Sequence, residues 1–252
     1  MEEKQIKVNH SLQKAFRIIE VMVQAGEEMS LNEISKQVEM PKATALRLIY
    51  TLQTMGYIKQ NKKNTNYSLT LKFQLLTNNM DVYQEMINMA RPSMQKISDT
   101  LSEATCLSIC DNNELVYIES IDSVDNLLNV TQKIGKRAPL YCTGAGKLYL
   151  STMPEKDLDR YLAETELVPL TEHTLTTKEE IKAIIEEIRQ NGYSLDDEEC
   201  EIGVKCVAMP VYDNQQNIVC TLSISMPTIR IDDQKITTVI ETLGRAINEL
   251  PM

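Results

Sequence analysis

Three helical patterns follow one another near the N-terminus, and they restrict the possible folds more than any other feature of the chain. Apolar residues recur at helical spacing over residues 12–23. Ser30 and Glu33, at capping-box spacing, begin a second helix. Pro41 suits the first turn of a third helix, which Gly56 ends. Because only about three residues join the last two helices, the pattern predicts a helix-turn-helix.

The third helix and the segment after it predict a surface that contacts DNA. With Ala45, Leu48 and Ile49 turned inward, the outward face offers cationic and hydroxyl groups to phosphates and base edges. Alternating residues around NKKNTN then predict a two-stranded wing. A solvated helix face and a polar loop are the alternative, but the ordered combination favours a winged helix. The candidate DNA-binding residues are Lys42, Ala43, Thr44, Arg47, Tyr50 and Thr51 on the helix and Lys62, Lys63 and Asn64 on the wing.

The charge of the chain is divided unevenly between its two parts. Residues 1–73 hold 11 Lys and Arg against seven Asp and Glu, a net charge of +4, whereas the whole chain carries −10 and the remainder therefore −14. A locally basic segment on an acidic protein can present itself to a polyanion such as double-stranded DNA.

Composition argues against several classes of protein. No apolar run reaches the roughly 18 residues of a membrane span, and the N-terminus lacks the apolar core of a secretory signal, so we expect a cytoplasmic protein without membrane contact. The six cysteines show no C-x-x-C spacing, which favours free thiols. The two histidines, His10 and His173, have no partner at ligand spacing, so neither a metal nor another cofactor is expected.

The rest of the chain predicts an α+β domain. A helix over residues 74–90 is expected to break at Arg91-Pro92, because a residue before proline disfavours the helical region. Apolar runs around Asp111-Asn112-Asn113 predict a hairpin, and LLNVTQKI, residues 127–134, predicts a further strand. Helices that bracket a mainly antiparallel sheet disfavour a dinucleotide-binding domain. The other expected elements are helices over 154–163, 177–192 and 233–250 and two strands within 204–227.

Four segments carry a resemblance to a known family. The chain resembles the IclR family of bacterial transcription regulators in both halves. The winged helix of that family is resembled by the segments SLQKAFRIIEVM and SLNEISKQVEMPKATALRLIYTLQTMGYI. The effector-binding domain is resembled by GKRAPLYCTGAGKLYL and GYSLDDEECEIGVKCVAMPVYDNQQNIVCTLSIS. Ala43-Thr44 stands where the family often has Ser-Thr, and Met226 where glycine is common. The resemblance implies a winged helix-turn-helix domain over 1–73, a linker helix over 74–90 and a GAF-like effector-binding domain over 91–252.

The resemblance also implies a pocket for a small organic acid or related metabolite. The main-chain N–H groups of Gly144 and Ala145 would meet a carboxylate, since a helix N-terminus offers unpaired donors and a favourable dipole. Cys206 can equally be a structural thiol, Ser223 and Ser225 can face solvent, and Asp196 lies in a charge run typical of a solvated loop. The implied lining is Asp196, Cys206, Ser223 and Ser225 on the polar side and Leu127, Leu128, Ala138 and Leu140 on the apolar side.

The segment GAGK, residues 144–147, does not complete the phosphate-binding loop of an NTPase. Such a loop needs glycine five positions before the Gly-Lys pair and Ser or Thr after it, where this chain has Tyr141 and Leu148. Lys147 is therefore expected on the helix surface. No catalytic motif is recognised elsewhere, so we expect no catalytic residues and no enzyme.

The leading prediction is a ligand-responsive transcriptional regulator, with a repressor favoured over an activator. Because one winged helix reads few base pairs, a homodimer or a homotetramer is expected. The alternative is a metabolic enzyme or anion-binding protein with an N-terminal regulatory winged helix. A third class, an RNA-binding or protein-binding winged helix, stays open.

Overall fold

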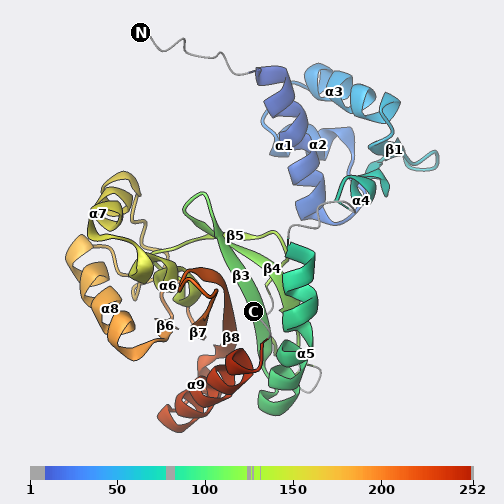
Figure 1. Ribbon diagram of the computed structural model, residues 1–252. Coiled ribbons are helices and arrows are strands. Elements are labelled where there is room, and N and C mark those ends of the chain that lie inside the picture. Colours follow the sequence, from blue (N-terminus) through green and yellow to red (C-terminus); the bar gives the residue numbers. More distant parts are fainter. Residues whose placement is uncertain (1–8, 78–82, 124–125, 127, 131, 251–252) are drawn as a thin grey trace. The chain divides into compact units, whose positions relative to one another are not determined.

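The structure is a computed structural model that describes residues 9–77, 83–123, 126, 128–130 and 132–250. The chain divides into two units, Met1–Asp81 and Val82–Met252 (Figure 1). Each unit has its own buried apolar core.

The N-terminal unit is a winged helix, as predicted. Asn9 caps the first helix, a complete capping box joins Ser30 and Glu33, and Gly26 ends the first helix in the left-handed conformation. Ile18, Ile34 and Ile49 are fully buried where the helices meet. The two strands pair antiparallel and form the wing. The elements are α1 (His10–Ala25), α2 (Leu31–Gln37), α3 (Lys42–Thr54), β1 (Ile58–Gln60), β2 (Tyr67–Leu69) and α4 (Lys72–Thr77).

The C-terminal unit is built on one antiparallel sheet with the order β5-β4-β3-β8-β7-β6. Its strands are β3 (Ala104–Asp111), β4 (Glu114–Ile121), β5 (Arg137–Pro139), β6 (Ser194–Asp197), β7 (Val204–Tyr212) and β8 (Ile218–Pro227). Its helices are α5 (Gln84–Leu101), α6 (Gly144–Thr152), α7 (Glu155–Glu164), α8 (Lys178–Asn191), the short 3-10 turn η2 (Thr228–Arg230) and α9 (Asp233–Asn248).

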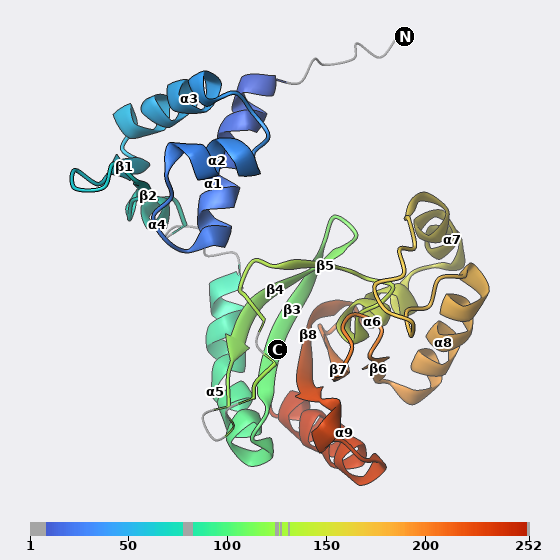
Figure 2. The same ribbon diagram turned by 180° about the vertical axis from the view of Figure 1, so that it is seen from behind.

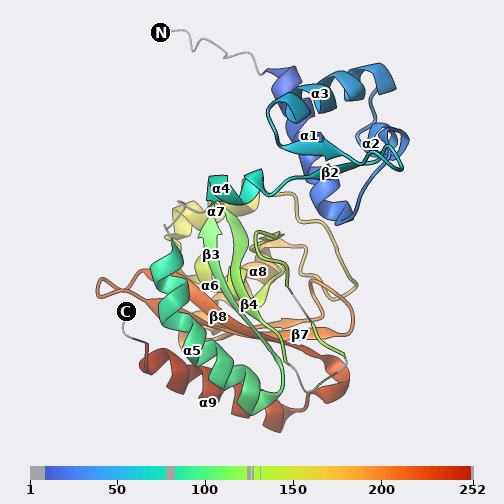
Figure 3. The ribbon, with the colours of Figure 1, turned by 90° about the vertical axis from the view of Figure 1, so that its right-hand side faces the viewer.

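Helices cover both faces of this sheet. α5 and α9 pack side by side on one face, and α6 lies on the other with α8 behind it (Figures 2 and 3). Asn112 and Asn113 both adopt positive φ between β3 and β4, the conformation of a tight hairpin turn, so the predicted hairpin is confirmed. The capping box of Thr177 with Glu180 starts α8 as its spacing predicts.

Two expectations about the elements are wrong. The helix does not break at Arg91-Pro92, because α5 continues through Pro92 to Leu101. Ala90 and Met94 are fully buried against the sheet, and this packing outweighs the loss of one helical hydrogen bond at proline. The strand expected over 127–134 is not formed by residues 128–130 and 132–134, and residues 127 and 131 lie outside the described residues. The edge strand beside β4 is β5 instead.

Candidate functional site

The glycines of GAGK allow the first turn of α6 to approach its neighbours closely. Thr143 caps the helix, since its hydroxyl accepts from the Gly146 N–H at 3.1 Å and donates to the Pro139 carbonyl at 2.8 Å. A Cβ atom on Gly146 would overlap Thr143 and come within 2.5 Å of the Leu140 backbone, so only glycine fits. Helix geometry leaves the N–H groups of Gly144 and Ala145 without an acceptor inside the helix.

Strand register brings the predicted polar residues to the same place. Cys206 of β7 pairs with Asp196 of β6 on one side and with Ser225 of β8 on the other. Ser223 lies on β8, two residues before Ser225. Side chains in one cross-strand row share a face of the sheet, and here that face is the one that α6 covers. Gly144 lies directly above them, because a Cβ there would be 3.4 Å from both the Asp196 nitrogen and the Cys206 carbonyl oxygen.

These groups line a small pocket of about 30 Å³. Asp196, Ser223 and Ser225 are almost fully buried, which excludes the solvated alternatives for them. The pocket is lined by Tyr117, Gln132, Lys136, Ala138, Thr143, Gly144, Ala145, Asp196, Cys200, Glu201, Val204, Cys206, Ser223 and Ser225.

Asp196 is the acid of the pocket. Its Oδ1 accepts from the backbone N–H groups of Glu199 at 2.9 Å and Cys200 at 3.3 Å, which closes a tight turn after β6. Burial raises the pKa of its carboxyl to about 7, against the opposing effect of Lys147. Near neutral pH both forms of this group are therefore populated, the carboxylate, which accepts hydrogen bonds, and the neutral acid, which can donate one.

Lys147 is buried and not on the helix surface, contrary to expectation. Its side chain is 1% exposed and forms an ion pair with Glu199. Burial raises the pKa of Glu199, and the lysine opposes this effect. Glu199 Oε2 has no hydrogen-bond partner among the described residues. The lysine thus ties α6 to the loop between β6 and β7, because a buried carboxylate needs a nearby cation.

Seven of the ten candidate pocket residues line the pocket, and two of the described candidates do not. Leu140 is fully buried in the apolar core beneath α6, and Leu128 is 54% exposed. Leu127 lies outside the described residues. Sequence reasoning missed Tyr117, although its alternation with buried Leu115 on β4 is a usable signal. It also missed six other lining residues. Gln132 precedes a recognised segment, and the others lie within these segments, namely Lys136, Thr143, Cys200, Glu201 and Val204.

The candidate DNA-binding residues gather on α3 and the wing of the N-terminal unit. On α3, Thr44 is half-buried and the others are exposed, with Tyr50 at 65%. Leu46, 44% exposed, shares this outer surface and was not expected there. Thr51 donates its hydroxyl to the Arg47 carbonyl at 3.0 Å, so part of its polar capacity is used inside the helix.

The wing tip is tied to the loop before α2. Asn61 and Asn64 each donate an amide hydrogen bond to Glu28 Oε2, at 2.8 and 3.1 Å. The hydrogen bond from Asn64, and to a smaller extent that from Asn61, holds the pKa of Glu28 below its ordinary value. Asn64 also accepts from the Asn66 N–H at 3.0 Å. Lys62 and Lys63 are exposed beside this anchored loop.

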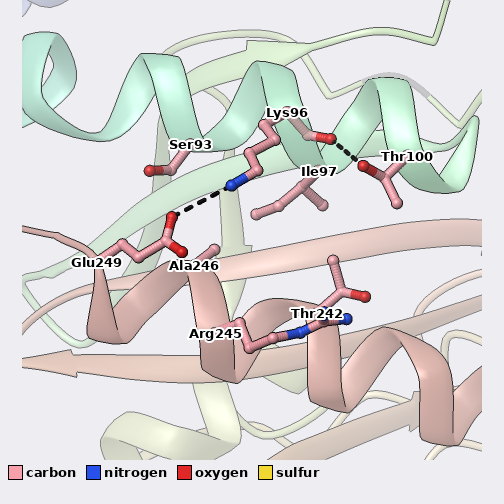
Figure 4. A pocket seen from close by; sticks show the side chains of 8 residues that line it. All are labelled: Ser93, Lys96, Ile97, Thr100, Thr242, Arg245, Ala246 and Glu249. Carbon is pink, nitrogen blue, oxygen red and sulfur yellow. Dashed lines mark hydrogen bonds and ion pairs between the residues drawn. The ribbon is translucent and has the colours of Figure 1, made fainter.

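A second cleft, of about 120 Å³, lies between α5 and α9 (Figure 4). Lys96 of α5 pairs with Glu249 across the cleft at 3.4 Å. Within α5, Thr100 donates a hydrogen bond to the Lys96 carbonyl at 2.6 Å. Lys96, Thr100 and Glu249 are exposed, and their polar groups bond to one another. This cleft therefore offers a ligand fewer convergent groups than the pocket at α6.

Neither a metal-binding cluster nor a membrane-spanning helix is found in the described part of the chain. No three His, Cys, Asp or Glu side chains lie there in a group that could hold a metal ion. No helix in those residues is long and apolar enough to cross a membrane. The six cysteines are free.

Comparison with known proteins shows the family. Residues 11–62 match the IclR helix-turn-helix domain, and residues 78–250 match the bacterial transcriptional regulator IclR C-terminal domain. The chain is 33% identical over 242 residues to the HTH-type transcriptional regulator KdgR of Escherichia coli (strain K12). The aligned region covers 95% of this chain and 90% of that protein. The chain is 25% identical over 244 residues to the acetate operon repressor of Salmonella typhimurium, covering 96% and 89%.

Solved structures agree with this assignment. The crystal structure of Thermotoga maritima IclR matches 95% of this chain and 96% of its own, with a TM-score of 0.78 and 29% identity. The chain therefore belongs to the IclR family of bacterial transcriptional regulators, which are not enzymes, and it combines a DNA-binding helix-turn-helix domain with a C-terminal effector-binding domain.

Proposed function

We propose that this protein is a cytoplasmic repressor whose affinity for operator DNA changes when a small hydroxylated carboxylate enters the pocket at α6. One observation carries the proposal. The N–H groups that begin α6, at Gly144 and Ala145, converge with the hydroxyl and carboxyl groups of Asp196, Ser223 and Ser225 on one buried pocket.

The lining supports both parts of the ligand class. Unpaired N–H groups and the dipole at a helix start stabilise a carboxylate. Hydroxyl and carboxyl groups on the sheet side suit the hydroxyls of a hydroxy acid, because a polar pocket left unpaired costs free energy when an apolar ligand fills it. Lys136 and Gln132 add further polar groups at the same pocket.

The size of the pocket supports a change of conformation on binding. A volume of about 30 Å³ leaves room for water but not for an organic acid, so such a ligand needs the walls to move apart. A ligand that binds the open conformation better shifts the protein toward it, and only such differential affinity can alter the hold on DNA. The loop at residues 198–203 is a wall that is free of regular structure.

The N-terminal unit supports a homodimer. A groove of about 640 Å³ runs between α1, α3 and α4, and exposed apolar side chains such as Leu12, Phe16 and Leu76 line it. We assign this groove to a second copy of the chain, since two winged helices on adjacent half-sites are needed for specific binding. Operator contacts are assigned to the candidate residues of α3 and to Lys62 and Lys63 of the wing, while Asn64 holds the wing through Glu28. Arg47 and Thr51 also line the groove.

A thermal-shift screen of small carboxylates, each paired with its amide and its deoxy analogue, tests the pocket. A ligand at 100 times its Kd should stabilise the protein by about 2.7 kcal/mol. Ser223→Ala and Asp196→Asn should reduce this stabilisation, whereas Ser194→Ala, a buried serine on β6 away from the pocket lining, should retain it. Equal stabilisation by acid and amide, or full stabilisation in both pocket variants, would refute the assignment.

Binding of the full chain to its own promoter DNA and to a scrambled sequence tests the DNA surface. Arg47→Ala should cost about 1 to 3 kcal/mol of specific binding. Arg17→Ala, which removes an exposed arginine from α1, is the matched control and should leave the preference for the promoter intact. Equal affinity of the unaltered protein for both DNAs would overturn the proposal.

A further inference from the structure

The end of α3, the helix with most of the candidate operator contacts, is bonded to the start of α4. Three successive carbonyl groups at this end accept hydrogen bonds from residues that lead into α4. The Met55 carbonyl accepts from Lys72 Nζ at 2.7 Å. The Gly56 carbonyl accepts from the Thr70 hydroxyl at 2.6 Å, and the Tyr57 carbonyl accepts from the Thr70 N–H at 2.9 Å. Because the last carbonyl groups of a helix have no partner inside it, such bonds keep the last turn of α3 from fraying.

Lys72 contacts this end of α3 in more than one way. Its ammonium group lies 4.7 Å from the centre of the Tyr57 ring, a distance at which an aromatic face attracts a cation. Its stem passes close to Gly56, where a Cβ atom would be 3.7 Å from Lys72 Cδ. The cation also stands at the partly negative C-terminal end of α3. Lys72 is therefore held by a carbonyl group and a ring at once.

Thr70 and Phe73 complete the junction between α3 and α4. The Thr70 hydroxyl accepts from the Lys72 N–H at 3.2 Å and so caps α4. The Phe73 ring lies 4.9 Å from the Tyr57 ring. A helix of six residues is too short to be stable alone, so α4 depends on these contacts for its place. The end of α3 and the first turn of α4 thus form one rigid unit.

We propose that Lys72 is a positioning residue for operator recognition, which fixes α3 to the start of α4 and makes no contact with DNA. A lysine of the basic N-terminal segment would by its charge alone be expected at a phosphate. The Lys72 ammonium group is instead directed at the Met55 carbonyl and the Tyr57 ring. The chain passes from α4 into the C-terminal unit, so a shift of α4 would move α3 with it.

Hydrogen exchange of the full-length protein without DNA tests the junction. Lys72→Met keeps the length of the stem and removes the charge and the donor, and it should fold because Lys72 is exposed. The N–H groups of residues 55–57 donate to carbonyl groups of α3 and should exchange about tenfold faster in this variant, the effect of losing one hydrogen bond to a charged group. Lys72→Arg, which keeps a charge and donors, should exchange like the unaltered protein. Lys62→Met, at the exposed wing tip, is the matched control and should do the same.

Titrations of promoter and scrambled DNA at several salt concentrations test the effect on recognition. Lys72→Met should lower promoter affinity by about tenfold, again the effect of one charged hydrogen bond, and leave affinity for scrambled DNA unchanged. It should keep the slope of log K against log salt, because that slope counts neutralised phosphates. Lys62→Met should reduce the slope by about 1. Lys72→Arg should restore promoter affinity.

The outcomes separate a positioning residue from a phosphate contact. A salt slope reduced by about 1 in Lys72→Met would place Lys72 on DNA and overturn the proposal. Unchanged exchange, faster exchange with unchanged promoter affinity, or no rescue by arginine would also overturn it. The expected loss of promoter affinity rests on the proposed operator surface, whereas the junction does not. If the unaltered protein showed no preference for the promoter, both proposals about recognition would fail, and the exchange rates would still show whether Lys72 holds the end of α3.

Discussion

At the scale of single residues, burial separates side chains that look alike in the sequence. Asp196 and Asp197 are neighbours in an acidic run, but β6 turns Asp196 under α6 and leaves Asp197 exposed, where it pairs with Lys205 at 2.7 Å. Burial raises the pKa of Asp196 to about 7. The same alternation places Ser223 and Ser225 at the pocket and Ile224 in the core on the other face.

Asp196→Asn should change the pH dependence of stability. The folded pKa of about 7 lies above the ordinary value of about 3.9, so the folded state binds the proton more tightly. This contribution is full at low pH and is lost as pH rises through 7, by about 3 kcal/mol between pH 5 and pH 8. Denaturant unfolding of both proteins at four pH values measures it. Parallel profiles would show that Asp196 titrates normally.

Gly146→Ala should destabilise the protein by about 3 kcal/mol or more, because its methyl group would overlap the Leu140 backbone and the Thr143 hydroxyl. Gly244→Ala on α9 is the matched control. A Cβ there has only Met209 at 3.8 Å, and alanine favours the helix by up to about 1 kcal/mol. Urea unfolding gives both values, and equal stability of the two variants would contradict the close packing inferred for α6.

At the scale of elements, contacts made by loop residues hold functional segments in place. Lys147 and Glu199 tie the start of α6 to the loop at residues 198–203. Glu28 holds the wing through Asn61 and Asn64. These contacts position surfaces that other residues use for binding, so their removal should weaken binding without altering sequence preference.

Asn64→Ala should weaken DNA binding while leaving its salt dependence unchanged, because the neutral amide anchors the wing and displaces no counterion. Lys62→Ala should instead reduce the slope of log K against log salt by about 1. In a Glu28→Ala background, Asn64→Ala should have no further effect. Titrations of promoter DNA at several salt concentrations measure all three, and additive losses would place Asn64 on the DNA itself.

At the scale of the whole molecule, exposed apolar surface predicts self-association. Phe16 is 55% exposed at the groove of α1, α3 and α4, and Val23 is 62% exposed on α1 outside the groove. Apolar patches of this kind mark interaction surfaces. The acidic sensor half carries a net charge opposite to that of the basic segment, so the N-terminal unit is the part suited to DNA.

Phe16→Ser should raise the dimer dissociation constant by about tenfold or more, as loss of a buried aromatic contact at an interface costs 1 to 4 kcal/mol. Val23→Ser should leave dimerisation unchanged. Light scattering over a concentration series measures both, and operator affinity should fall only for Phe16→Ser. A monomeric unaltered protein would refute the dimer.

Local signals were sufficient for much of the fold. Capping at Ser30–Glu33 and Thr177–Glu180, helix ends at Gly26 and Gly192, and the Asn112-Asn113 turn depend on residues a few positions apart, so the sequence reports them directly. The resemblance added the family and seven of the residues that line the pocket. Predictions failed where the outcome depends on contacts with residues far along the chain. Pro92 stays helical because its neighbours pack on the sheet.

The sequence by itself determined most of the helices and their caps, the hairpins, the division of charge and the family of this protein, since each depends on short-range periodicity or on a recognisable order of residues. Only the tertiary structure decided that Lys147 is buried against Glu199 and that Leu140 lies in the core. These outcomes follow from strand register and from α6 packing closely on β6, β7 and β8, which join segments that are far apart in the chain.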